Sequence, residues 1–309
     1  MLEYMAQISS QVAVLFIMIA SGFVLFKWGG LKKEYLTGFT TVLLYLITPA
    51  LLIDSMTGVE FSAETATELL MVFAIATVVH LLAYIITLPL FRRDPQKKRV
   101  VYRAAVILSN AGFMSLPLAS ALIGPKGVFL VSVYVMVFNL FVWTVVYGMF
   151  NPGKFNVKKL LLNPGIIGVS IGAFLFFTGI RLPSMISSAV GYLAGMNTPL
   201  AMITIGGMIA VGGITVKKEE ILCMVQSISL RLLVLPLIVL AALLPLGLDP
   251  QFTFAVMIPV CAPVAANTAI FASQFNADGP LGSKLLAVST VASVFTMPFI
   301  LALTRWLSV

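Results

Sequence analysis

The sequence predicts an all-α membrane protein with ten transmembrane helices, built from two inverted halves of five helices each. Three observations lead to this fold class. The first is composition: 60% of the 309 residues are hydrophobic, only 10% are charged, and the mean hydropathy is +1.08. Because a soluble domain carries about 25% charged residues, this chain cannot cover itself with a water-compatible surface. The other two observations are the number of long apolar runs and the distribution of basic residues.

Ten apolar runs are long enough to cross a bilayer, for which a helix needs roughly 20 mostly apolar residues. The first follows Glu3 rather than a basic stretch, so we do not expect a cleaved signal peptide. In chain order the predicted spans cover about residues 6–26, 36–56, 67–91, 100–123, 127–149, 163–180, 185–214, 221–245, 252–273 and 283–305.

The basic residues are concentrated on one side of this topology. If the N-terminus is outside, all but four of the 19 Lys and Arg residues fall in cytoplasmic loops; the exceptions are Lys126, Arg181, Arg231 and Arg305. This bias follows the positive-inside rule. It predicts a multi-pass protein of the cell (plasma) membrane with both termini extracellular. The net charge of +8 then belongs to a membrane face that contacts anionic lipid, and no nucleic-acid partner is expected.

Helix-breaking pairs recur half a chain apart. Thr48-Pro49 in the second span and Thr198-Pro199 in the seventh are separated by 150 residues, as are Gly22 and Gly172. Five spans per half force the second copy to enter the membrane upside down. We therefore expect a first inverted repeat at residues 1–150, a cytoplasmic linker at 151–162 and a second inverted repeat at 163–309.

Two spans contain central helix breakers together with polar residues. A proline cannot donate to the carbonyl four residues earlier, and free backbone groups at membrane depth are tolerated only beside protein or water. A single kink can also serve packing, but two matched breaks favour a site where half-helix N-termini hold an anion. The candidate substrate-binding residues are Asn110, Gly112 and Pro117 in the fourth span and Pro259, Pro263, Asn267 and Thr268 in the ninth.

Two ionisable residues lie mid-span at nearly equivalent depths, and both are candidates for coupling or support. His80 could carry a proton or could be a neutral imidazole bonded to a neighbouring helix. Arg231 stays charged and needs water, a carbonyl group or a counter-ion. Asp54 ends the second span, where we expect it to reach the outer interface. With no carboxylate at matching depth, coupling to protons or sodium is left open.

Signatures of enzymes and metal sites are absent from the sequence. It contains no HExxH, GxSxG or GxxxxGK[ST] motif and only one histidine. Both cysteines, Cys223 and Cys261, lie in apolar runs and are expected to fill space in the core. We therefore expect no enzymatic activity, no cofactor and no metal site.

Four segments resemble the auxin efflux carrier family of membrane transporters, which includes plant auxin exporters and bacterial organic-acid permeases. The resemblance covers the whole chain. Asn110 followed seven residues later by Pro117 is similar to the family's crossover in helix 4, and Pro263 corresponds to the crossover proline in helix 9. The segments are YLITPALLI, SNAGFMSLPL, MNTPLAMITIGGMI and CAPVAANTAIFASQF.

The resemblance implies a scaffold at residues 1–66 and 163–216 and a mobile transport domain at 67–150 and 217–309. Substrate carboxylate would bind near Asn110 and move by an elevator-like shift. The sequence thus predicts a secondary transporter of small organic anions, mono- or dicarboxylates such as malate or malonate. Alternatives are a passive anion channel, an auxin-like aromatic carboxylate exporter and a membrane receptor. The expected partners are the lipid bilayer and the carboxylate; a homodimer and the direction of transport are left open.

Overall fold

The computed structural model describes residues 2–152, 162–212 and 216–308, and within these ranges every named element is a helix. Seven helical segments are long and apolar enough to cross a membrane. Three shorter apolar helices, Ala111–Leu122, Pro164–Thr178 and Pro250–Cys261, fall where the fourth, sixth and ninth spans are predicted. The all-α membrane class is therefore confirmed, whereas the count of ten and the inverted repeat stay predictions.

The first half of the chain contains eight α-helices and three π-helical turns, labelled η. They are α1 (Leu2–Lys27), α2 (Lys33–Val42), η1 (Leu43–Ile47), α3 (Thr48–Thr57), α4 (Ala63–Thr87), α5 (Gln96–Ile107), η2 (Ala111–Ser115), α6 (Leu116–Leu122), α7 (Pro125–Phe141), η3 (Val142–Val146) and α8 (Tyr147–Phe150).

The described part of the second half also consists of α-helices and short helical turns. Its elements are α10 (Pro164–Thr178), α11 (Ser184–Gly195), α12 (Asn197–Gly212), α13 (Lys218–Ser229), η4 (Leu230–Val234), α14 (Leu235–Leu243), the 3₁₀ turn η5 (Leu244–Leu246), α15 (Pro250–Cys261), α16 (Ala266–Gln274) and α17 (Gly279–Leu307). Most of the predicted linker, and residues 213–215 of the predicted scaffold, lie outside the described residues.

Several prolines widen a helix instead of ending it. Pro49, Pro117 and Pro236 each occupy the second position of an α-helix that directly follows a π turn. A proline removes one backbone donor, and a π turn absorbs the mismatch without a gap in the helix. The prediction that Thr48-Pro49 interrupts the second span is therefore wrong in detail, since α2, η1 and α3 run continuously from Lys33 to Thr57. The seventh span does bend, at Met196 between α11 and α12.

Two helix crossings depend on the glycines spaced 150 residues apart. α1 packs against α12, where a Cβ atom added to Gly22 would clash with the backbone of Ile203. α3 packs against α10, where a Cβ atom added to Gly172 would lie 2.9 Å from Cβ of Met56. Close approach through small residues is a common way to pack membrane helices. The first predicted span thus packs on the seventh and the sixth on the second, which are equivalent pairs in an inverted repeat.

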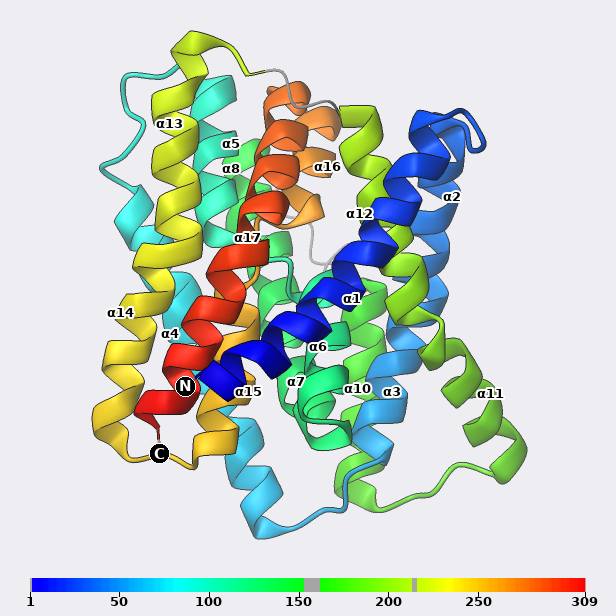
Figure 1. Cartoon of the computed structure of the whole chain (residues 1–309). Coiled ribbons are helices and arrows are strands. Elements are labelled where there is room, and N and C mark those ends of the chain that lie inside the picture. The colour runs from blue at the N-terminus through cyan, green and yellow to red at the C-terminus, as the bar shows by residue number, and fades with distance from the viewer. Residues whose placement is uncertain (1, 153–161, 213–215, 309) are drawn as a thin grey trace.

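The two ends of the molecule carry different connections (Figure 1). Both termini and the α3–α4 and α14–α15 connections lie at the lower end in this view, and the α4–α5 and α12–α13 connections lie at the upper end. The upper end therefore carries the described parts of two loops, residues 88–95 and 216–217, that the sequence predicts to be basic and cytoplasmic. Their side of the membrane stays a prediction.

Candidate functional site

The fourth and ninth predicted spans are both interrupted, and their interruptions pair with each other. Residues 108–110 separate α5 from η2, and residues 262–265 separate α15 from α16. The N–H of Asn110 donates to the carbonyl of Pro263 at 2.7 Å, and the N–H of Ala265 donates to the carbonyl of Leu108 at 3.0 Å. These two bonds form a short antiparallel bridge centred on Ser109 and Val264. The structure therefore brings the two broken helices together, as the sequence predicts.

Of the three prolines predicted to break the helices, only one lies in a break. Pro259 lies inside α15, which continues to Cys261, and Pro117 lies inside α6. Only Pro263 sits in an interruption, and the break before Asn110 contains no proline. The prediction that all three prolines hold the helices open is therefore wrong for Pro117 and Pro259. A single missing donor leaves most of a helix intact, whereas pairing between the two extended segments gives their backbone groups partners outside a helix.

Arg231 joins the ends of the two half-helices that precede the crossover. This residue of η4 is only 1% exposed. Its guanidinium donates to the carbonyl of Val106 at the end of α5, at 3.1 Å, and to the carbonyl of Val260 at the end of α15. A cation at a helix C-terminus is favoured by the helix dipole. Arg231 thus has the carbonyl partners that its buried charge was predicted to need, and its side chain caps both half-helices.

Beside the bridge lies a cavity of about 100 Å³, which we call the crossover cavity. Asn110 is 3% exposed, and its Nδ2 has no hydrogen-bond partner in the described part of the chain. The Oγ1 of Thr48 is likewise buried and has no partner there. Unpaired buried polar groups are costly, so these atoms are available for a ligand. The polar side chains that line the cavity come from Thr48, Asn110, Asn139, Asn163, Asn267 and Tyr45.

The crossover cavity is suited to an anion. The helical run Ala111–Leu122 begins directly after Asn110, α16 begins one residue before Asn267, and α10 begins directly after its N-cap, Asn163. Helix N-termini present free N–H groups and the positive end of the helix dipole. No charged side chain is found among the described residues that line this cavity. Its binding capacity therefore consists of amides and helix N-termini.

The remaining candidate residues divide between the cavity and its surroundings. Gly112 lines the crossover cavity, whereas Pro117 and Thr198 line a second cavity. Thr268 is fully buried in α16, and its hydroxyl has no partner in the described ranges. Pro49 and Pro199 lie within the first turns of α3 and α12 and line neither cavity.

His80 lies away from the crossover cavity. It projects from α4 onto the rings of Tyr134 and Phe141 of α7, with ring centroids 5.2 and 5.0 Å away. Its Nδ1 lies 2.7 Å from the carbonyl of Ala76 in its own helix, whereas one of the two predicted alternatives had the imidazole bonded to a neighbouring helix. Its Nε2 has no partner within the described residues. His80 therefore packs between two helices of the predicted transport domain.

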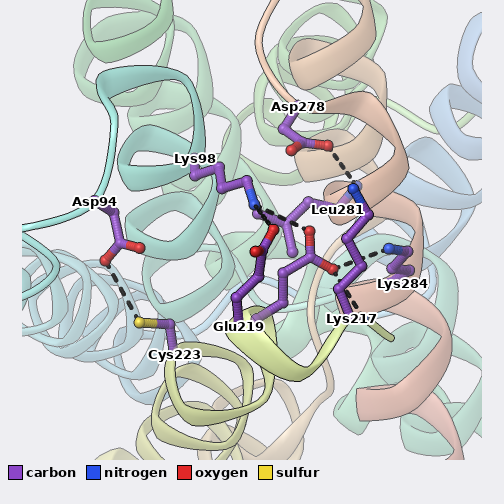
Figure 2. A network of polar contacts seen from close by, with 9 residues as sticks. Asp94, Lys98, Lys217, Glu219, Cys223, Asp278, Leu281 and Lys284 are labelled. Carbon is purple, nitrogen blue, oxygen red and sulfur yellow. Dashed lines mark hydrogen bonds and ion pairs between the residues drawn. The ribbon is translucent and has the colours of Figure 1, made fainter. Parts of the chain in front are cut away.

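Sequence reasoning missed a buried ion network at the end of the molecule that carries the basic loops (Figure 2). The carboxylate of Glu220 in α13 accepts from Lys98 of α5 at 3.1 Å and from Lys284 of α17 at 3.0 Å. The Glu220 side chain is only 4% exposed. Nearby, the Cys223 thiol donates to Asp94 at 3.4 Å. The network ties together three helices of the predicted transport domain. In the sequence, Glu220 looked like an ordinary first-turn acidic residue in a basic loop.

A cavity lined by several asparagine side chains at the meeting point of two broken helices, inside an apolar helical protein, is typical of a membrane transporter. Comparison with known families agrees. A family described as "Membrane transport protein" matches residues 7–301, so the chain belongs to this auxin efflux carrier-like transporter family. The resemblance identified from the sequence is thereby confirmed.

Two relatives are uncharacterized transporters of archaea. One, from Methanocaldococcus jannaschii, is 23% identical over 206 residues, which is 63% of this chain and 67% of that protein. The other, from Methanothermobacter thermautotrophicus, is 22% identical over 290 residues, which is 91% of this chain and 93% of that protein. The similarity therefore reaches across nearly the whole length of a transporter.

Proposed function

We propose that this protein is a secondary transporter of small organic anions, mono- or dicarboxylates such as malate or malonate. The observation that carries the proposal is the crossover cavity, which offers four asparagine amides and three helix N-termini without an acidic side chain. A carboxylate would accept hydrogen bonds from Asn110 and Asn267, and the N-terminal dipoles would offset its charge. The volume of about 100 Å³ favours a small ligand.

An elevator-type mechanism would use the position of this cavity. Thr48 and Asn163 belong to the predicted scaffold, whereas Asn110, Asn139 and Asn267 belong to the predicted transport domain. A ligand held by the transport domain would exchange one scaffold wall for another as that domain slides. Arg231 would preserve the crossover during this movement, and the Glu220 network would keep α5, α13 and α17 together as a unit. Transport across the plasma membrane, with both termini outside, completes the proposal.

The test is uptake of carboxylates into liposomes that contain the purified protein. We expect saturable uptake, and we expect Asn110→Ala to reduce it at least about tenfold, because a ligand would lose a hydrogen bond to a charged group. Asn151→Ala is the matched control, since Asn151 lies at the end of α8 and outside the lining of the cavity. Unchanged carboxylate uptake by Asn110→Ala would contradict the site, and non-saturating flux would indicate the passive channel instead.

An aromatic carboxylate is the second candidate substrate, because aromatic side chains form much of the cavity wall. Tyr45, Phe113, Phe138 and Trp143 all line it. Flat apolar walls suit an aromatic ring, and ring pairs contribute beyond the area that they bury. The same liposome assay should therefore include benzoate and indole acetate beside malate and malonate. Uptake restricted to the aromatic acids would establish the auxin-like alternative.

A further inference from the structure

A second cavity, of about 260 Å³, lies further along the helical run Ala111–Leu122, at Leu116, Pro117 and Ser120, and is lined from α3, α6, α11 and α12. We call it the Asp54 cavity. Asp54 and Asn197 face it together with Ser120 and Thr198. The sequence analysis assigned Asp54 to the outer interface and gave no role to Asn197. The structure places a half-buried Asp54 and a fully buried Asn197 along one partly open cavity with two hydroxyl groups.

Asn197 lacks hydrogen-bond partners. It is 1% exposed at the start of α12, and neither Oδ1 nor Nδ2 has a partner among the described residues. Leaving one buried polar group unpaired costs about 1–3 kcal/mol, and here two atoms of one side chain are unpaired. A side chain in this state, facing a cavity, is poised to coordinate something that enters it.

Asp54 supplies a negative charge without a counter-ion. Its carboxylate makes no ion pair in the described part of the chain. The carboxylate reaches α11, since a Cβ atom added to Gly191 would lie 3.7 Å from Asp54 Oδ1. No other charged side chain is found among the described residues that line the cavity. An ionisable group inside a membrane protein is expensive and is a functional candidate by default.

We propose that the Asp54 cavity binds a monovalent metal cation, with Na⁺ as the first candidate. Its available donors are oxygens: one carboxylate, the Oδ1 of Asn197 and the hydroxyls of Ser120 and Thr198. Hard cations prefer oxygen ligands, and divalent cations usually need more than one carboxylate. A single negative charge with neutral oxygens matches a charge of +1. The remaining volume has room for water molecules that complete the coordination.

At the crossover, a cationic side chain already contacts the ends of the half-helices. In many transporters with broken helices, half-helix C-terminal carbonyls coordinate the coupling ion. Here the guanidinium of Arg231 already occupies the carbonyls of Val106 and Val260. We therefore expect a cation to bind at the carboxylate of Asp54 instead. Asp54 and Asn197 belong to the predicted scaffold, whereas Ser120 belongs to the predicted transport domain, so binding would respond to the position of the two domains. Only this last step rests on the proposed carboxylate transport.

The test is Na⁺ binding to the purified protein, measured by isothermal titration with choline replacing Na⁺ in the reference buffer and with no carboxylate present. We expect one Na⁺ per chain. Asp54→Asn and Asn197→Ala should each weaken binding at least about tenfold, the lower range for loss of a supporting ligand at a metal site. Glu60→Gln is the matched control, because its carboxylate is 96% exposed in the connection after α3. That variant should bind Na⁺ as the unaltered protein does.

The possible outcomes distinguish failure of the cation site from failure of the proposed function. Retained Na⁺ affinity in Asp54→Asn, or stabilisation of the protein by acid but not by Na⁺, would overturn the cation site. Thermal unfolding in choline buffer checks that each variant is folded, and if Asp54→Asn fails this check, Asn197→Ala decides. Na⁺ binding without any carboxylate uptake would leave the cation site standing and contradict the proposed function alone.

Discussion

The crossover cavity lies at the beginning of the helical run Ala111–Leu122 and the Asp54 cavity lies further along it, and each is bounded by one member of the repeated Thr-Pro pair. Thr48 lines the first and Thr198 lines the second. The first cavity contains amides and helix N-termini without a charge, whereas the second contains a carboxylate. We therefore propose ligands of opposite sign for the two cavities.

The difference comes from two positions. At the spacing of 150 residues, Asp54 corresponds to Thr204, whose hydroxyl donates to the carbonyl of Leu200 in its own helix at 2.6 Å. Asn197 corresponds to Ile47, which is fully buried. The crossover cavity therefore lacks counterparts of both cation ligands. If the predicted repeat is correct, differences at these two positions distinguish the proposed cation site from the proposed anion site.

The largest expected effect follows from Arg231→Met, which removes the cap shared by α5 and α15. Losing a buried charge with two carbonyl partners should cost about 3 kcal/mol or more, measured as a lower thermal midpoint in detergent. Arg231→Lys should recover part of the loss. Among molecules that stay folded, carboxylate binding should fall while Na⁺ binding persists. Equal loss of both ligands would show that the two cavities are not separate sites.

Asn110→Asp tests most directly whether the crossover cavity binds an anion, because it introduces a carboxylate like the one that the Asp54 cavity already has. The substitution is nearly isosteric. At pH 7 we expect carboxylate binding to fall about 100-fold through like-charge repulsion. As the pH falls toward the ordinary pKa of Asp, about 3.9, the added group becomes neutral and the ratio of variant to wild-type affinity should recover. A ratio that does not change with pH would contradict an anion site at Asn110.

The smallest effects separate the two threonines. Thr48→Val should weaken carboxylate binding about fivefold, since one hydrogen bond contributes about 1 kcal/mol, and should leave Na⁺ binding unchanged. Thr198→Val should do the reverse. Each variant is therefore the control for the other, with both ligands titrated on both proteins. If the two substitutions affected the same ligand, the assignment of one threonine to each cavity would be wrong.

Much of the crossover was predictable because its signals are local. Asn110, Gly112 and Asn267 were selected as polar or small residues in the middle of apolar spans, and all three line one cavity. The prolines were a poorer guide. Pro117 and Pro259 remain within helices, because one missing hydrogen bond bends or widens a helix more readily than it ends it.

The offset between the halves was also only partly predictable. The Thr-Pro pairs lie 150 residues apart, but the antiparallel bridge is centred on two residues that lie 155 apart, Ser109 and Val264. Backbone pairing at the crossover carries no side-chain signature, so this shift of five residues could not be predicted from the residue pattern. The cavity that Asp54 faces and the ion network of Glu220 could not be predicted for a related reason. A carboxylate near a helix end looks interfacial until the helices packed against it are known.

The composition and the order of residues by themselves determined that this chain is a helical membrane protein with basic loops on one face and interrupted helices at the fourth and ninth spans. These properties depend on hydropathy and on backbone chemistry within one helix. Only the tertiary structure decided that Arg231 caps two helices at once, that Glu220 joins three, and that Asp54 and Asn197 share a cavity. Such contacts join residues far apart in sequence, and their geometry exists only once the helices are packed.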